Sequence, residues 1–246
     1  MLKKLLSITL AVAMILGVNT YAFASNNENF TIDPSQIRVE HGSSNNFYRS
    51  SKIEDVIEKE AKKEKNVKYS VTIAVEQPNK GSYDAAALKL GGGKDTGFKT
   101  LDVGHTFIVL GNHTKKEGSY STKGFYPAEA MSLDDVLDKT SVSGTVSDDT
   151  GHKYHAKKTY YITKSQYDKI STYISDNSSS DYNIVSYNCT TFAVKALEAG
   201  NINDTGIKER TWQVPKSFDK KIGKENVDKA RKFKGYYPGA AGQQLK

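Results

Sequence analysis

The sequence predicts an α+β fold in which an antiparallel sheet packs against helices. Alternating or continuous apolar stretches rich in β-branched residues are typical of strands, and they span 69–77, 103–110, 119–126, 152–162 and 182–187. Apolar residues at helical spacing predict helices, and these span 52–65, 131–139, 164–175 and 189–199. The turn at 111–116 joins two predicted strands into a hairpin, so we expect those two strands to pair antiparallel.

The N-terminus has the three parts of a secretory signal peptide. Lys3 and Lys4 are followed by an apolar run at 5–18 and by the small-x-small pattern Ala-Phe-Ala at 22–24. We therefore expect the mature chain to begin near Ser25 and to be secreted, either extracellular or associated with the cell wall. The apolar run is shorter than the roughly 20 residues of a membrane-spanning helix, so no transmembrane anchor is expected after processing.

The chain divides into four predicted segments. Residues 1–24 are the signal peptide, and residues 25–66 are an Asn- and Ser-rich disordered arm followed by a short amphipathic helix. Residues 67–215 contain the predicted strands and most of the helices, and they form the main domain. Residues 216–246 are a C-terminal tail with one further helix.

The charge of the chain argues against nucleic acid as a partner. The net charge is +7, and removing Lys3 and Lys4 leaves 33 basic against 28 acidic residues, a surplus of 5. This surplus is spread as single lysines rather than gathered into a basic stripe. We expect only weak attraction to anionic cell-wall polymers or lipid headgroups.

Cys189 is the only cysteine, so an internal disulfide is impossible. A lone thiol can be an inert core residue, a dimer link or a nucleophile. Cys189 stands where a predicted strand ends and the helix 189–199 begins, beside N–H groups that lack partners within the helix. These groups and the helix dipole stabilise a thiolate and can bind a developing oxyanion. We therefore favour a nucleophile, with support from Asn188 as N-cap and from Thr190.

His105 is the second candidate catalytic residue. It follows Gly104 at the start of an apolar strand, where it is suited to act as a general base, although a capping or surface histidine is the alternative. Two other histidines, His152 and His155, lie three apart on a predicted strand and so face opposite sides. No zinc-ligand spacing is present, and we expect neither a metal nor a cofactor.

Two short motifs resemble a known family. Gly-His-Thr-Phe-Ile at 104–108 and Tyr-Asn-Cys-Thr-Thr-Phe-Ala at 187–193 are similar to the two halves of a circularly permuted NlpC-like papain fold, the order found in lecithin retinol acyltransferase and related bacterial hydrolases. The resemblance covers about residues 69–215. It implies a papain-like catalytic domain with Cys189 as nucleophile and His105 as general base.

The same resemblance implies a third polar residue that orients the imidazole from the next strand. The hairpin returns beside His105 at 125–127, where Tyr126 is the polar residue. We therefore expect Tyr126 to be the third catalytic residue, with an ordinary aromatic packing role as the alternative.

Together these features predict a secreted thiol hydrolase or acyltransferase. It would act on an amide or ester bond through an acyl-thioester at Cys189, and its substrate would be a peptidoglycan peptide, a protein or an acyl lipid. The alternative is a catalytically inactive secreted binding or effector module that keeps the fold without turnover.

Overall fold

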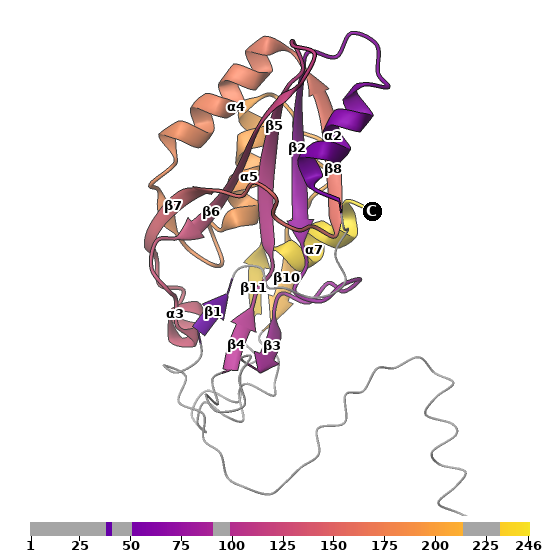
Figure 1. Ribbon diagram of the computed structural model, residues 1–246. Helices are drawn as coiled ribbons and strands as arrows, with labels where there is room; N and C mark the ends of the chain where they lie inside the picture. Colours follow the sequence, from indigo (N-terminus) through magenta and orange to yellow (C-terminus); the bar gives the residue numbers. More distant parts are fainter. Residues whose placement is uncertain (1–37, 41–50, 91–98, 214–231) are drawn as a thin grey trace, which may run out of the picture. The chain divides into compact units, whose positions relative to one another are not determined.

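An antiparallel sheet of six strands is the centre of the fold (Figure 1). The computed structural model describes residues 38–40, 51–90, 99–213 and 232–246, so the predictions for the signal peptide and for most of the arm and the tail lie outside the described residues. The strand order is β8-β2-β5-β6-β7-β9, and every neighbouring pair is antiparallel. The strands are β2 (Tyr69–Glu76), β5 (His105–Asn112), β6 (Ser119–Pro127), β7 (Val142–Asp148), β8 (Ala156–Ile162) and β9 (Asp181–Tyr182). The predicted α+β class with an antiparallel sheet is confirmed.

Alternating side chains give this sheet two apolar faces. Along β5, Phe107 and Val109 belong to one core cluster, whereas Ile108 and Leu110 belong to the other. Successive residues of a strand point to opposite faces, so each cluster must be covered by its own helices.

Helices cover both faces of the sheet. On one face, α2 (Ile53–Ala61) buries Ile53 and Ile57 beside Phe107 and Val109. On the other face, α4 (Lys164–Asp176) and α5 (Cys189–Ala199) bury their apolar sides. In Figure 1, α2 lies on the opposite side of the sheet from α4 and α5.

Smaller elements complete the fold. Two are the helices α3 (Leu133–Asp138) and α7 (Pro238–Gln244). One small sheet contains β1 (Arg38–Glu40), β4 (Lys99–Asp102) and β3 (Ala87–Leu90), and another pairs β10 (Arg210–Gln213) with β11 (Lys232–Gly235). All these elements fall within one compact unit, Thr31–Lys246. The amphipathic helix of the arm and the helix of the tail therefore share a unit with the main domain.

Two predicted strands are clearly shorter in the structure, and one strand of the main sheet was not predicted. The strand expected at 152–162 begins only at Ala156, because the His152 N–H donates to the Asp149 carbonyl and closes a turn. The strand expected at 182–187 is reduced to β9, followed by a single bridge between Asn183 and Tyr187. Strand β7 was not predicted, because its Ser, Gly and Thr residues weaken the apolar alternation on which such predictions depend.

Within the described ranges, no helix combines the length and the apolar character needed to cross a membrane.

Candidate functional site

Asn188 fixes the start of α5 and thereby the position of Cys189. Its side-chain oxygen accepts hydrogen bonds from the backbone N–H groups of Thr190 and Thr191, at 2.9 and 3.1 Å. Its amide nitrogen donates to the carbonyls of Ile184 and Tyr236, each at 2.8 Å. Asn188 is thus the N-cap that the sequence predicts, and Cys189 is the first helical residue, only 1% exposed.

Thr190 joins the helix to the sheet. Its hydroxyl shares a 2.8 Å hydrogen bond with the hydroxyl of Thr106 on β5, and its backbone N–H donates to the side-chain oxygen of Asn188. In this structure Thr190 therefore holds α5 against β5, and its N–H is already engaged rather than open to an oxyanion.

His105 opens β5 and is completely buried. Its Nε2 lies 2.8 Å from the Oδ2 atom of Asp149. Gly104 precedes it with φ +70°, a conformation that glycine adopts freely, and a Cβ there would lie 2.5 Å from the Glu76 carbonyl oxygen. Beneath the ion pair, a Cβ on Gly124 would overlap both the Asp149 carboxylate and the imidazole. Gly124 therefore leaves room for the histidine and its carboxylate, and Gly104 allows the chain before His105 to approach the backbone of β2.

Asp149 makes the hydrogen bond that we expected of Tyr126. It follows β7 in a turn, its backbone N–H donates to the Thr122 carbonyl, and the residue is 6% exposed. Tyr126 does lie beside His105, with the two rings stacked at 4.3 Å between centroids, but its hydroxyl donates to Asp149 Oδ1 at 2.8 Å. Tyr126 thus contacts the carboxylate as well as the ring. The expectation from the hairpin missed Asp149 because this residue comes from a turn beyond a strand that was not predicted.

Opposing influences act on the protonation of His105. Burial by itself would lower the pKa of the imidazole, but side-chain hydrogen bonding with Asp149 and then with Cys189, and the charges of both, raise the pKa to about 9. Asp149 occupies Nε2, so Nδ1 is the ring nitrogen that remains for the thiol, and Nδ1 has no well-aligned hydrogen-bond partner among the described atoms. A pKa of about 9 keeps His105 protonated at neutral pH, and Cys189 is one of the groups that raise it.

Tyr182 is a member of this site that the sequence did not identify. It is fully buried on β9, and Cys189 is the neighbour that most affects the pKa of its phenol. Burial and the neighbouring thiol hold its pKa well above the usual value, so it stays a neutral phenol. In the sequence it is one of 15 tyrosines and has the apolar periodicity of a core residue, so no local signal separates it from the others.

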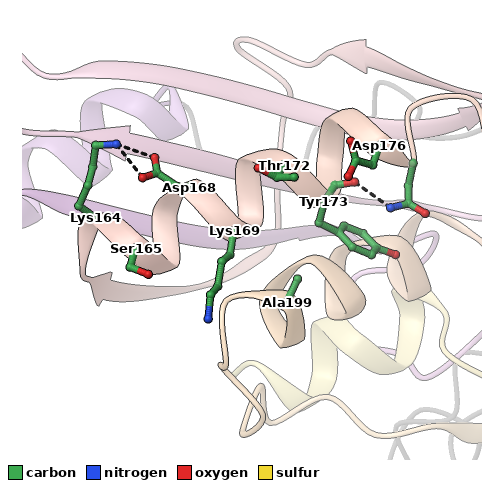
Figure 2. A pocket seen from close by; sticks show the side chains of 9 residues that line it. Lys164, Ser165, Asp168, Lys169, Thr172, Tyr173, Asp176 and Ala199 are labelled. Carbon is green, nitrogen blue, oxygen red and sulfur yellow. Dashed lines mark hydrogen bonds and ion pairs between the residues drawn. The ribbon is translucent and has the colours of Figure 1, made fainter.

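The chemistry-bearing side chains gather away from the surface depression shown in Figure 2. That depression, of about 790 Å³, runs along α4, where Lys164 is paired with Asp168. None of Cys189, His105 and Asp149 lines it. Within the described part of the chain, no group of three or more His, Cys, Asp or Glu side chains is arranged to hold a metal ion.

Comparison with protein-family models, with curated proteins and with solved structures found no match to this chain.

Proposed function

We propose that this protein is a thiol hydrolase or acyltransferase that acts on an amide or ester bond, with Cys189 as nucleophile and His105 as acid and base. One observation carries the proposal: a completely buried imidazole is bonded to a carboxylate through Nε2, and the thiol at the start of α5 is one of the groups that raise the pKa of that imidazole. A nucleophile, a base and a group that orients the base form the arrangement typical of covalent acyl transfer. The finer assignment, a papain-like fold of permuted NlpC-like order, belongs to the same proposal, because His105 precedes Cys189 along the chain.

Each of the three residues has its own role in the proposed reaction. The thiolate of Cys189 attacks the carbonyl carbon, and a C–S bond forms while the bond to the leaving nitrogen or oxygen breaks. His105, which holds its proton at neutral pH, gives that proton to the leaving group. Water or an acceptor hydroxyl then attacks the acyl-thioester and passes its proton to His105, so the thiolate is regenerated. Asp149 stabilises the imidazolium through the first half of this cycle.

The substrate class follows from the predicted compartment. A secreted chain with a modest positive charge meets peptidoglycan peptides, proteins and acyl lipids outside the membrane. We propose a peptide of the cell wall first, because wall peptides contain amide bonds and lie in the predicted compartment, and an ester lipid second.

One observation favours a second candidate function, a binding or effector module without turnover. Cys189 is 1% exposed and His105 is fully buried, so neither presents a side-chain surface to an approaching substrate in this conformation. In such a module the thiol and the imidazole would stabilise the junction of α5 with the sheet and nothing more.

Alkylation of the single cysteine separates the two functions. The full chain is treated at pH 7 with iodoacetamide, a reagent small enough to enter a narrow site, and labelling is followed by mass spectrometry. A nucleophilic Cys189 is alkylated faster in the folded chain than in the urea-unfolded chain, despite its burial, and Cys189→Ser is not labelled. Slower labelling in the folded chain would establish the non-catalytic module.

Turnover is tested on wall peptides, protein amides and ester lipids. Cys189→Ser and His105→Ala should each lower product release by orders of magnitude, and the double variant should cost no more than either change alone, because nucleophile and base act as a unit. Equal turnover in the wild type and in Cys189→Ser would place the chemistry elsewhere.

A further inference from the structure

A second pair of a carboxylate and an imidazole lies beside His105. Glu76, the residue of β2 that stands opposite His105 in the register, is 2% exposed. Its Oε2 atom lies 3.0 Å from Nε2 of His152. The His152 ring meets both His105 and Phe107 edge-on, each at 5.1 Å between centroids. The proposed reaction uses neither Glu76 nor His152, so their position beside the catalytic imidazole needs an explanation.

His152 also closes the turn that carries Asp149. Its backbone N–H donates to the Asp149 carbonyl at 2.8 Å. The side chain of His152 is held on β2 by Glu76, so this end of the turn is tied to the strand next to β5. On the other side, Oε1 of Glu54 on α2 accepts hydrogen bonds from the Thr122 hydroxyl at 2.6 Å and from the Gly151 N–H at 3.4 Å. The carboxylates of Glu76 and Glu54 thus hold the turn at 149–152 from two sides.

We propose that His152, held by Glu76, is a positioning residue for the proposed thiol chemistry: it keeps Asp149 against His105 and confines the His105 ring so that the imidazole meets Cys189. The inference rests on the proposed function. Physically, the imidazole of His105 touches Tyr126 on one side by stacking and His152 by an edge, and it is fully buried between such neighbours. Removing the edge contact and the tie to β2 allows the turn to move away and the ring to rotate.

The protonation of His105 reports this positioning without any substrate. In the full chain, ¹⁵N-edited NMR of the histidine rings is followed as a function of pH for the wild type, His152→Ala and Glu76→Ala. The pKa of His105 should fall from about 9 toward 6.5 in both variants, because the contact with Asp149 that raises it is loosened. Alkylation of Cys189 by iodoacetamide at pH 7 should slow by roughly tenfold or more in the same variants.

Conservative and remote variants give the test its controls. Glu76→Gln keeps an acceptor for His152 and should stay close to the wild type in both measurements. His113→Ala is the matched control, because His113 is also a partly buried imidazole, bonded at 2.8 Å to Ser70 on β2, but it follows the opposite end of β5. That change should leave both the His105 titration and the alkylation rate unchanged.

The double variant Glu76→Leu/His152→Leu covers the case in which a single change prevents folding. It removes both partners together, so no buried charge is left unpaired and the fold is retained more easily. It should show the same fall in the pKa of His105. A folded His152→Ala or double variant with His105 still titrating near 9 and with wild-type alkylation would overturn the inference. Slow alkylation of the wild type itself would refute the proposed function instead, and the NMR titration would still test the positioning role.

Discussion

His105 combines complete burial with a raised pKa, and Asp149 is the main reason. A buried imidazole ordinarily loses its proton more easily, because burial penalises the charged form. Here Asp149 accepts a hydrogen bond from Nε2 at 2.8 Å and is itself held by the Tyr126 hydroxyl and by the backbone of β6. A carboxylate held in this way can stabilise the imidazole at each stage of a reaction cycle in which it is protonated.

Asp149→Asn should therefore reduce turnover by roughly 10²-fold or more while leaving the fold intact. The amide has the shape of the carboxylate but no negative charge, so the pKa of His105 should fall from about 9 and the proton needed by the leaving group is lost at neutral pH. The measurements are product release and the NMR titration of His105.

Asp148→Asn is the matched control for this prediction. Asp148 is the adjacent residue, but it is exposed and its Oδ1 accepts hydrogen bonds from the backbone N–H and hydroxyl of Thr150. This change should leave the pKa of His105 unchanged. A His105 pKa that stays near 9 in Asp149→Asn would show that another group stabilises the imidazolium.

The N-cap of α5 begins the helix and also fixes the position of the proposed nucleophile, Cys189. Asn188 satisfies two N–H groups of the first turn, those of Thr190 and Thr191. Thr163 caps α4 in a similar way, with a capping box that includes Gln166. The two caps are alike in their hydrogen bonding, but only the cap of α5 precedes the thiol.

Asn188→Ala and Thr163→Ala should both lower the free energy of unfolding, by about 1 kcal/mol for a lost cap. Asn188→Ala should cost more, because the buried carbonyls of Ile184 and Tyr236 lose their donor as well. Urea unfolding measures both effects. Iodoacetamide alkylation of Cys189 should slow only in Asn188→Ala. Equal alkylation rates in the two variants would mean that the cap does not position the thiol.

Residues from both layers of the fold meet at the site. Glu54 of α2 holds the turn that carries Asp149, whereas Cys189 comes from α5 on the other face of the sheet. The stability of the fold and the protonation of the site are therefore linked. The folded pKa of His105, about 9, lies above its ordinary value of 6.5, so the folded state binds this proton more tightly than the unfolded chain does.

The sign of this linkage predicts a loss of stability at alkaline pH. The contribution of His105 is fully present below pH 6.5 and disappears as the pH rises through about 9. The difference between the two pKa values corresponds to about 3 kcal/mol. Urea unfolding measured from pH 6 to 10 should show this decline in the wild type and a flatter profile in Asp149→Asn. Parallel profiles for the two proteins would contradict the linkage.

Local features of the fold could be predicted from sequence because they depend on near neighbours along the chain. The apolar repeat of 164–175 and of 189–199 led to α4 and α5 within one residue of their bounds. Asn188 was identified as a cap, and the hairpin of β5 and β6 followed from its turn. These signals span at most a few residues or one hairpin, so periodicity and capping chemistry are sufficient to reveal them.

The contacts around the imidazole required the folded chain. Asp149 lies 44 residues after His105, and His152 lies 76 residues after Glu76. Neither pairing has a local pattern, because it arises from the order in which β2, β5, β6 and β7 are placed in the sheet. For the same reason Tyr126 was expected to bond the imidazole directly, whereas it stacks on the ring and donates to Asp149. Sequence periodicity therefore located Cys189 and His105 on their elements, and the strand order of the sheet selected the side chains that surround them.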